Sequence, residues 1–200
     1  MAVDIYCYIE LLTNHGWMFS GEIGPNPEHI YDPEAPELAP IPFFHSVQKE
    51  LAAILVDTGR PIRSTEPYQP IVARRGQPAD LSSVLRHHFK YYSYGDAMVY
   101  SWFTTEELIA FDLQSKTMIR QAYVDTEVAH IFADCPTGSP LSLWPKDKPI
   151  RYADWSREGI EVRWRESYAS IIREFTDVVP RALLKDGSAC ETRLIVQAGW

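Results

Sequence analysis

The sequence predicts an α+β fold in which strands at the two ends of the chain pack with helices from its middle. Two observations support this. Apolar and polar residues alternate over residues 3–11, which is typical of a half-buried strand, and residues 192–198 form a second strand-like run. Apolar residues between them recur at helical spacing. We expect a single globular domain over residues 1–200, with a small antiparallel or mixed sheet that includes both terminal strands and packs against several helices.

A turn and a proline-rich segment follow the first strand. Residues 13–16 are typical turn residues, so residues 17–19 are expected to return as the second arm of a hairpin. Residues 24–45 contain six of the fifteen prolines. Because proline fixes φ and has no N–H to donate, we expect this segment to be an extended surface loop without regular elements.

Two helices are predicted before the centre of the chain. Apolar residues in 47–56 fall at i, i+4, i+7 and i+8, which is one face of a helix. A second helix is expected to begin at Asp80 or Ser82, either of which is a good N-cap, and to end at Gly95.

Two more helices are predicted after it. Thr104 and Glu107 form a capping box, so a short helix is expected from Thr104. Residues 164–185 show helical spacing, with Pro180 marking a kink or a stop. Residues 118–150 support no prediction.

Charge is distributed unevenly along the chain. The formal net charge is −8, and residues 1–48 contain seven acidic residues and no Lys or Arg. Residues 60–95 instead hold six basic residues against two acidic ones, a local excess of four positive charges. A globally negative protein repels a polyanion, so duplex DNA is not expected as a partner, whereas a small anion held by a few arginines is.

The cellular location is predicted from segments that are absent. No apolar run approaches the roughly 20 residues that span a bilayer, and residues 1–10 lack the features of a signal peptide. Cys7, Cys135 and Cys190 lie far apart, unlike a disulfide framework or a zinc site. We therefore expect a cytoplasmic protein with reduced thiols and no membrane contact.

No catalytic residue, metal ligand or cofactor is assigned from motifs. The sequence contains no P-loop, GxGxxG, HExxH, GxSxG or EF-hand pattern. His87 and His88 are neighbours that point about 100° apart on a helix, so they do not form a convenient pair of ligands for one metal.

The first candidate site is the polar stretch that precedes the second helix. Arg74 and Arg75 are followed by Gly76, and Asp80 lies at the expected helix start. Guanidinium groups beside free backbone N–H groups suit a phosphate or a carboxylate. The alternative is that these arginines pair with acids of the first 48 residues.

Aromatic residues make the second candidate. Tyr100 and Trp102 precede the third helix, and Tyr6 and Tyr8 lie on the polar side of the first strand. Their rings could stack on a base while a hydroxyl or N–H orients it. They could equally cover a sheet edge or a subunit interface. The predicted ligand-binding set is Arg74, Arg75, Asp80, Tyr100, Trp102, Tyr6 and Tyr8.

Several segments, taken in order, resemble an uncharacterised family of short phage and prophage proteins. Its members carry CDIHxYVE, RNYxLFAILAxVRN, RGLPDDxS, HSxSWLTxxEL and a final RLVFWFDN-like strand. The matching stretches here are VDIYCYIE, ELAAILVDTGR, RRGQPADLS, YSWFTTEELIAFD and TRLIVQAGW. Tyr6 and Tyr100 stand where the family has histidines, so any acid/base or metal pair formed by those histidines would be lost in this chain.

The resemblance implies a phage-type origin and makes host defence a plausible target. The first hypothesis is an anti-defence protein that sequesters a small anionic immune signal, such as a cyclic nucleotide or an ADP-ribose derivative, without catalysis. We expect a homo-oligomer, because a shared pocket removes more ligand surface from water. The second hypothesis is a phosphoesterase with a base among His87, His88, Asp80 and Asp96. The third is an inhibitor that binds a host protein through its acidic first quarter.

Overall fold

The protein is described by a computed structural model that covers residues 3–57, 66–92, 98–138, 140–148, 151–152, 158–186 and 191–199. The chain divides into two compact units, each described by itself. Unit 1 consists of Met1–Thr58, Pro70–Phe111 and Glu174–Trp200, and unit 2 of Gly59–Gln69 and Asp112–Arg173. The predicted α+β class is confirmed, with strands and helices in both units.

A five-stranded antiparallel sheet forms the centre of unit 1. The strand order is β2-β1-β10-β6. The fifth strand, β5, pairs with β1 on the same edge as β2, but with the first half of β1 instead of the second. The register between β1 and β10 runs from Asp4 opposite Gly199 to Leu11 opposite Thr192. The terminal strands lie in one sheet, as the sequence predicts, and the structure shows that they are neighbours in it. The strands are β1 (Asp4–Thr13), β2 (Gly16–Phe19), β5 (Phe44–Ser46), β6 (Val99–Thr104) and β10 (Thr192–Gly199).

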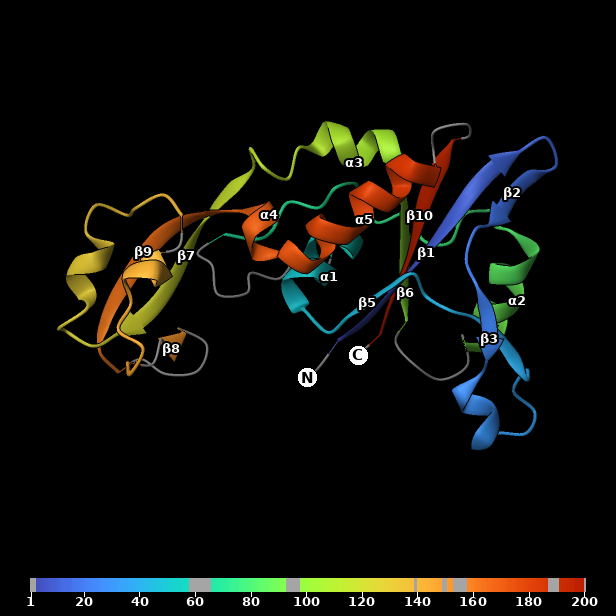
Figure 1. The fold of residues 1–200 in the computed structure, drawn as a ribbon, viewed down its shortest axis with the longest axis horizontal. Helices are drawn as coiled ribbons and strands as arrows, with labels where there is room; N and C mark the ends of the chain where they lie inside the picture. The colour runs from blue at the N-terminus through green and yellow to red at the C-terminus, as the bar shows by residue number, and fades with distance from the viewer. Residues whose placement is uncertain are drawn as a thin grey trace. The chain divides into compact units, whose positions relative to one another are not determined.

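Helices cover both faces of this sheet, as Figure 1 shows with the sheet seen nearly edge-on. On one side lie α1 (Lys49–Val56) and α5 (Arg173–Asp186), and on the other lies α2 (Ser83–Tyr92). Side chains alternate between the two faces along β1 and β10, and the face toward α1 and α5 is apolar. It is formed by Ile5, Cys7, Ile9, Leu194, Val196 and Ala198. The opposite face, under α2, carries the polar and aromatic side chains of the candidate site.

The predicted starts of α1, α2 and α3 (Thr105–Phe111) lie close to the observed ones. Both α1 and α2 begin within three residues of the expected positions, and α1 ends at Val56, where Asp57 adopts a left-handed φ of 52°. The capping box of α3 is present, because the Thr104 N–H donates to Glu107 Oε2 at 3.0 Å. The Glu107 N–H donates in return to Thr104 Oγ1 at 3.2 Å.

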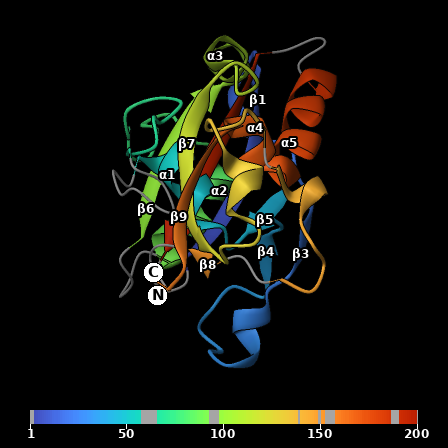
Figure 2. The same cartoon turned by 90° about the vertical axis from the view of Figure 1, so that its left-hand side faces the viewer.

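The prediction of an irregular loop over residues 24–45 is wrong. Two short strands, β3 (Ile23–Pro25) and β4 (Leu38–Pro40), pair with each other and enclose the 3-10 helix η1 (Pro27–Ile30). Three prolines fit these elements because Pro25 and Pro40 end strands and Pro27 opens η1, where a backbone N–H is not needed. The other three lie in the segments between the elements. The Asn26 side chain accepts from the Glu28 N–H and donates to the Pro36 carbonyl at 2.7 Å. We call residues 22–43 the arm; it extends below the sheet in Figure 2.

Unit 2 contains a three-stranded antiparallel sheet in the order β8-β7-β9. Its core consists of Ala122, Val124, Val128, Phe132, Val162 and Trp164. Its elements are β7 (Thr117–Val124), η2 (Ala129–Phe132), η3 (Pro140–Leu143), β8 (Arg151–Tyr152), β9 (Ile160–Ser167) and α4 (Tyr168–Ile171).

The predicted helix over residues 164–185 starts too early. Residues up to Ser167 belong to β9, because buried Val162 and Trp164 alternate with exposed charged residues, which is strand periodicity. Helical structure begins at Tyr168, and Pro180 lies inside α5 without ending it.

Two smaller predictions concern thiols and membranes. Cys7 and Cys135 are free thiols, and Cys190 lies outside the described residues. Within the described ranges, no helix has the length and apolar character needed to cross a membrane.

Candidate functional site

The predicted aromatic residues meet on the face of the unit-1 sheet that lies under α2. Tyr6 of β1 and Tyr100 of β6 both pair with Gln197 of β10. Tyr8 and Trp102 flank Ile195 in the same way. Opposite residues of an antiparallel ladder share a face, so four of the seven predicted site residues lie side by side.

These aromatic residues pack against α2, and only Tyr8 among them is fully buried. Tyr8 is only 2% exposed and forms a core cluster with Leu85 and Phe89 of α2, against which Tyr100 and Trp102 also pack. Tyr100 lies 5.0 Å from Phe89 between ring centroids. For Trp102 and Tyr100 the structure therefore favours the packing interpretation that the sequence left open.

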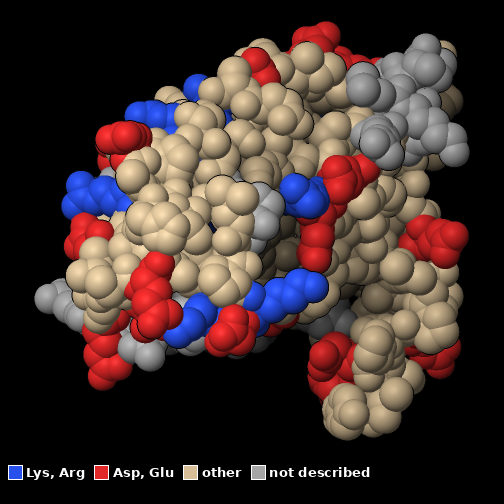
Figure 3. All heavy atoms as spheres, turned by 60° about the vertical axis from the view of Figure 1, so that its left-hand side comes forward, with Lys and Arg blue, Asp and Glu red and all other residues tan. Residues whose placement is uncertain are grey.

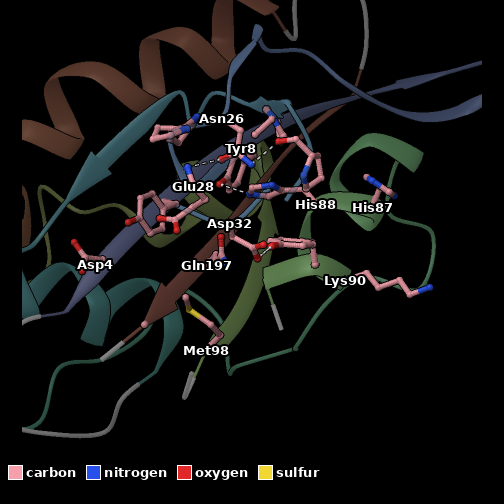
Figure 4. Close-up of a pocket in the computed structure, with 18 of the residues that line it drawn as sticks. Asp4, Tyr8, Asn26, Glu28, Asp32, His87, His88, Lys90, Met98 and Gln197 are labelled. Atoms are coloured by element: carbon pink, nitrogen blue, oxygen red, sulfur yellow. Dashed lines mark hydrogen bonds between the residues drawn. The ribbon is translucent and has the colours of Figure 1, made fainter. Parts of the chain in front are cut away.

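A hollow of about 1100 Å³ opens beside the start of β1 (Figure 4). Its walls come from β1, the arm, the second half of α2 and the end of β10, all within unit 1. Tyr6 and Tyr8 belong to its lining, whereas Arg74, Arg75, Asp80, Tyr100 and Trp102 do not. The remaining side chains that matter for its chemistry are Asp4, Glu28, Asp32, Glu34, His87, His88, Lys90, Tyr91 and Gln197.

Carboxylates dominate the charge of the hollow. Four acids line it against one lysine, and Lys90 extends away from the acids in Figure 4. Asp32 accepts a hydrogen bond from the Tyr91 hydroxyl, which together with the Glu34 N–H holds the pKa of Asp32 below its usual value. Asp32 is therefore ionised at neutral pH. The hollow thus presents many hydrogen-bond acceptors and a negative potential.

Two further groups in the hollow are neutral at physiological pH. Burial, and to a smaller degree the charge of His87, lowers the pKa of His88 to about 4. His88 Nε2 lies 3.2 Å from the Tyr8 hydroxyl, so a neutral imidazole can accept that proton. Burial raises the pKa of Tyr6, and Asp4 and Glu28 raise it further, so its hydroxyl stays protonated.

Sequence reasoning missed His45, which lies against Tyr6. Their rings stack with centroids 4.9 Å apart and an angle of 20° between planes. The His45 ring also contacts Asp4 through Nε2 and Oδ1 at 3.3 Å. Only the pairing of β5 with β1 brings His45 to Tyr6. A three-residue strand separated from its partner by the whole arm leaves no local signal in the sequence.

The two predicted arginines lie elsewhere. The Arg75 guanidinium binds both carboxylate oxygens of Glu107, at 2.9 and 2.5 Å, and lies 4.6 Å from the centre of the Trp102 ring. The hydrogen bond from Arg75 is the main cause that lowers the pKa of Glu107. The partner is thus an acid of α3 and not one of the first 48 residues. Arg74 is exposed beside it.

Asp80 belongs to a buried cluster around Arg193, which sequence reasoning also missed. Arg193 is 1% exposed; its Nη1 donates to Asp80 at 2.7 Å and its Nε to Glu10 at 2.9 Å. Glu10 is fully buried and accepts a further bond from the Ser82 N–H at 2.8 Å. The indole of Trp17 covers the guanidinium, 4.0 Å from the ring centre. Asp80 therefore holds the start of α2 to the sheet.

Several residues that match the phage-family motifs lie close to Arg75 and Arg193. Glu10 and Asp80 bind Arg193, and the centre of the Trp102 ring is 5.5 Å from the Arg193 guanidinium and 4.6 Å from that of Arg75. These contacts are structural, because they join the sheet, α2 and α3. The resemblance itself stays a prediction.

Neither metal binding nor a comparison with known proteins assigns a function to the hollow. Among the residues that the structure describes, no three His, Cys, Asp or Glu side chains are grouped so that they could hold a metal ion. Comparison of the chain with models of protein families, with curated proteins and with solved structures finds no match.

Proposed function

We propose that unit 1 binds a small anionic, nucleotide-derived molecule in the hollow and sequesters it without catalysis. The observation that supports this is the combination, in one cavity of about 1100 Å³, of the Tyr6 ring with four carboxylates. A cavity of this size accommodates a ligand as large as a dinucleotide. An aromatic face stacks on any base, while carboxylates accept hydrogen bonds from ribose hydroxyls and amino groups.

The charge of the hollow determines which end of such a ligand enters. Four carboxylates repel phosphate, so the nucleoside part is expected to lie against Tyr6 and the acids. Phosphates would face outward, toward Lys90 and His87 on α2. This placement differs from the arginine site expected from the sequence, because the Arg75 guanidinium is already bound by Glu107. Cyclic nucleotides and ADP-ribose derivatives remain the proposed ligands.

Hydrolysis of the ligand is less well supported than capture. A general base works best with a pKa near the working pH, and His88, with a pKa of about 4, is a weak base at neutral pH. Asp80 is bound to Arg193 and does not line the hollow. Asp96, another candidate, lies outside the described residues.

The biological setting of the proposal follows from the resemblance to phage and prophage proteins. Capture of an immune signalling nucleotide in the cytoplasm of the bacterial host would make the protein an anti-defence factor. Tight capture also favours a homo-oligomer, because ligand surface left open at the mouth of the hollow could be covered by a second copy.

The proposal is tested by incubation with a panel of cyclic oligonucleotides, ADP-ribose derivatives and their parent nucleosides. The protein is separated from free ligand, heated, and the released compounds are identified by chromatography. Recovery of an intact compound supports capture. Recovery of a changed compound would establish catalysis instead, and retention of none of the panel would reject the proposal.

A variant pair assigns the binding to the hollow. Tyr6→Ala should weaken retention by about 5- to 150-fold, since stacking on one aromatic ring contributes about 1–3 kcal/mol per base. Tyr31→Ala is the matched control, because Tyr31 is 84% exposed on the arm and does not line the hollow. Equal retention by the two variants would exclude Tyr6 from the site.

A further inference from the structure

The acidic side chains of the hollow come from two of its walls. Asp4 belongs to β1, whereas Glu28, Asp32 and Glu34 belong to the arm. Residues 22–43 contain no Lys or Arg. Figure 3 shows the arm as the lobe at the lower right, where acidic and uncharged atoms appear without basic ones. A ligand in the hollow therefore meets negative charge from both walls.

Three of these four carboxylates have oxygens that no protein donor uses. Asp32 accepts from the Tyr91 hydroxyl and the Glu34 N–H. Within the described part of the chain, the carboxylates of Glu28 and Glu34 have no hydrogen bond or ion pair, and Asp4 contacts His45 through one oxygen only. Their charge is thus available to a ligand.

Tyr6 presents one ring face beside these carboxylates. His45 stacks on the ring with centroids 4.9 Å apart, and His45 does not line the hollow whereas Tyr6 does. The opposite face is therefore the one left for a ligand. Asp4 lies two positions before Tyr6 on the same side of β1, about 7 Å along the strand. The face of an aromatic ring carries negative charge density and attracts a cation.

We propose that the hollow selects nucleotides whose base carries a positive charge, such as a pyridinium or an N1-alkylated adenine. This inference rests on the proposed capture of a nucleotide and names the class of base that is captured. The cationic ring stacks on the open face of Tyr6, with the carboxylates of Asp4 and Glu28 close to it. An uncharged base stacks there too, but it gains neither the cation–π contact nor the Coulomb attraction.

The rest of such a ligand suits the opposite side of the hollow. Lys90 of α2 belongs to the lining, and Figure 4 shows its side chain directed away from Asp4 and Glu28. A nucleotide with a cationic base has positive charge at one end and phosphate at the other, so each end meets opposite charge. A free polyamine would match only the acids, and a nucleotide with an uncharged base would match only Lys90.

Equilibrium dialysis with matched pairs of ligands tests this preference. NAD+ is compared with NADH, whose nicotinamide ring is uncharged, and 1-methyl-AMP with its uncharged isomer N6-methyl-AMP. The cationic member of each pair should bind about tenfold more tightly, through one cation–π contact and attraction to partly exposed carboxylates. Added salt should lower this ratio, because exposed charges are screened. Equal affinities within either pair would overturn the inference.

The result is separable from that of the proposed function. If nucleotides with uncharged bases bind as tightly as the cationic ones, capture stands and the preference is wrong. If no nucleotide of either kind binds, both proposals are wrong. Tighter binding of spermidine than of both cationic nucleotides would make the hollow a site for free cations, and that result also overturns the inference.

Protein variants assign the preference to named side chains. Asp4→Asn and Glu28→Gln should each lower the ratio of the affinities for NAD+ and NADH about twofold. Glu37→Gln is the matched control, because Glu37 is an exposed carboxylate of the same arm that does not line the hollow. Tyr6→Phe keeps the ring and should keep the ratio, whereas Tyr6→Leu should lower it about threefold.

The ratio also controls for misfolding of a variant. An unfolded fraction lowers the bound amounts of both ligands alike and leaves the ratio of their affinities unchanged. A ratio that stays the same in Asp4→Asn, Glu28→Gln and Tyr6→Leu, or that falls as much in Glu37→Gln as in Glu28→Gln, would overturn the assignment to the hollow.

Discussion

Replacement of Arg193 by Met is the sharpest test of how unit 1 is held together. The Arg193 side chain is 2% exposed, and it binds Glu10, whose side chain is fully buried, and Asp80, whose side chain is 64% exposed. After Arg193→Met the Asp80 carboxylate can return to water. Glu10 cannot, and it keeps only the hydrogen bond from the Ser82 N–H. Removal of one member of a buried pair typically costs about 3–5 kcal/mol of unfolding free energy, and we expect that range here.

The companion variants follow from the same asymmetry. Glu10→Gln should cost less than Arg193→Met, because Asp80 still neutralises the guanidinium and the amide oxygen can still accept from Ser82. The double variant should lose less than the sum of the single losses, because no uncompensated charge remains buried. Arg75→Met is the control: the side chains of Arg75 and Glu107 are each 32% exposed, so its loss should stay within about 1 kcal/mol.

Urea unfolding followed by the fluorescence of the six tryptophans measures these differences. Equal slopes of unfolding free energy against urea are needed for the comparison, because a changed slope would indicate a changed unfolded or folded state. A loss below about 1 kcal/mol for Arg193→Met, or strictly additive losses in the double variant, would refute the claim that a buried ion pair fixes α2 to the sheet.

Two further predictions concern pH and ligand binding. The pKa of His88 is lowered to about 4 in the folded protein, below the value of 6.5 in the unfolded chain. The stability contributed by neutral His88 is therefore present above pH 6.5 and is lost as the pH falls from 6.5 to about 4. His88→Gln should flatten the decline of unfolding free energy measured over that interval, and an unchanged decline would contradict the burial argument. Arg75→Ala should leave retention of a nucleotide ligand unchanged and shift the melting temperature by only a few degrees, since Arg75 does not line the hollow. Loss of retention in that variant would return the site to the arginines.

Local sequence patterns predicted β1 and the start of α3. The alternation in residues 3–11 identified β1, and its period of two placed Tyr6 and Tyr8 on the same face. The capping box identified the start of α3 from two residues. In each case the residues that carry the signal also form the structure, so no information from distant parts of the chain was needed.

The missed features depend on contacts between distant residues. Glu10 and Arg193 are 183 positions apart, and charged side chains are ordinarily expected at the surface. Their burial follows from the pairing of the two terminal strands, whereas the sequence predicted only that both strands belong to one sheet. The end of β9 was predicted as helix because its period of two was not recognised. Its buried residues Val162 and Trp164 are followed closely by a true helical segment that begins at Tyr168. The combined run imitated one long helix.

The β1 strand places the hollow proposed to bind the ligand and the Arg193 cluster at different points along its length. Tyr6 at one end belongs to the hollow, and Glu10, four residues further on, lies in the Arg193 cluster, about 13 Å away at the rise of a strand. A strand paired on both edges transmits little change in side-chain position over that distance. Tyr6→Ala should therefore lower ligand retention with little loss of stability, and Arg193→Met should lower stability while the folded fraction still retains ligand. If Arg193→Met abolished retention in protein that is still folded, the hollow would need the whole polar face of the sheet, and the ligand would extend toward Trp17 and Trp102.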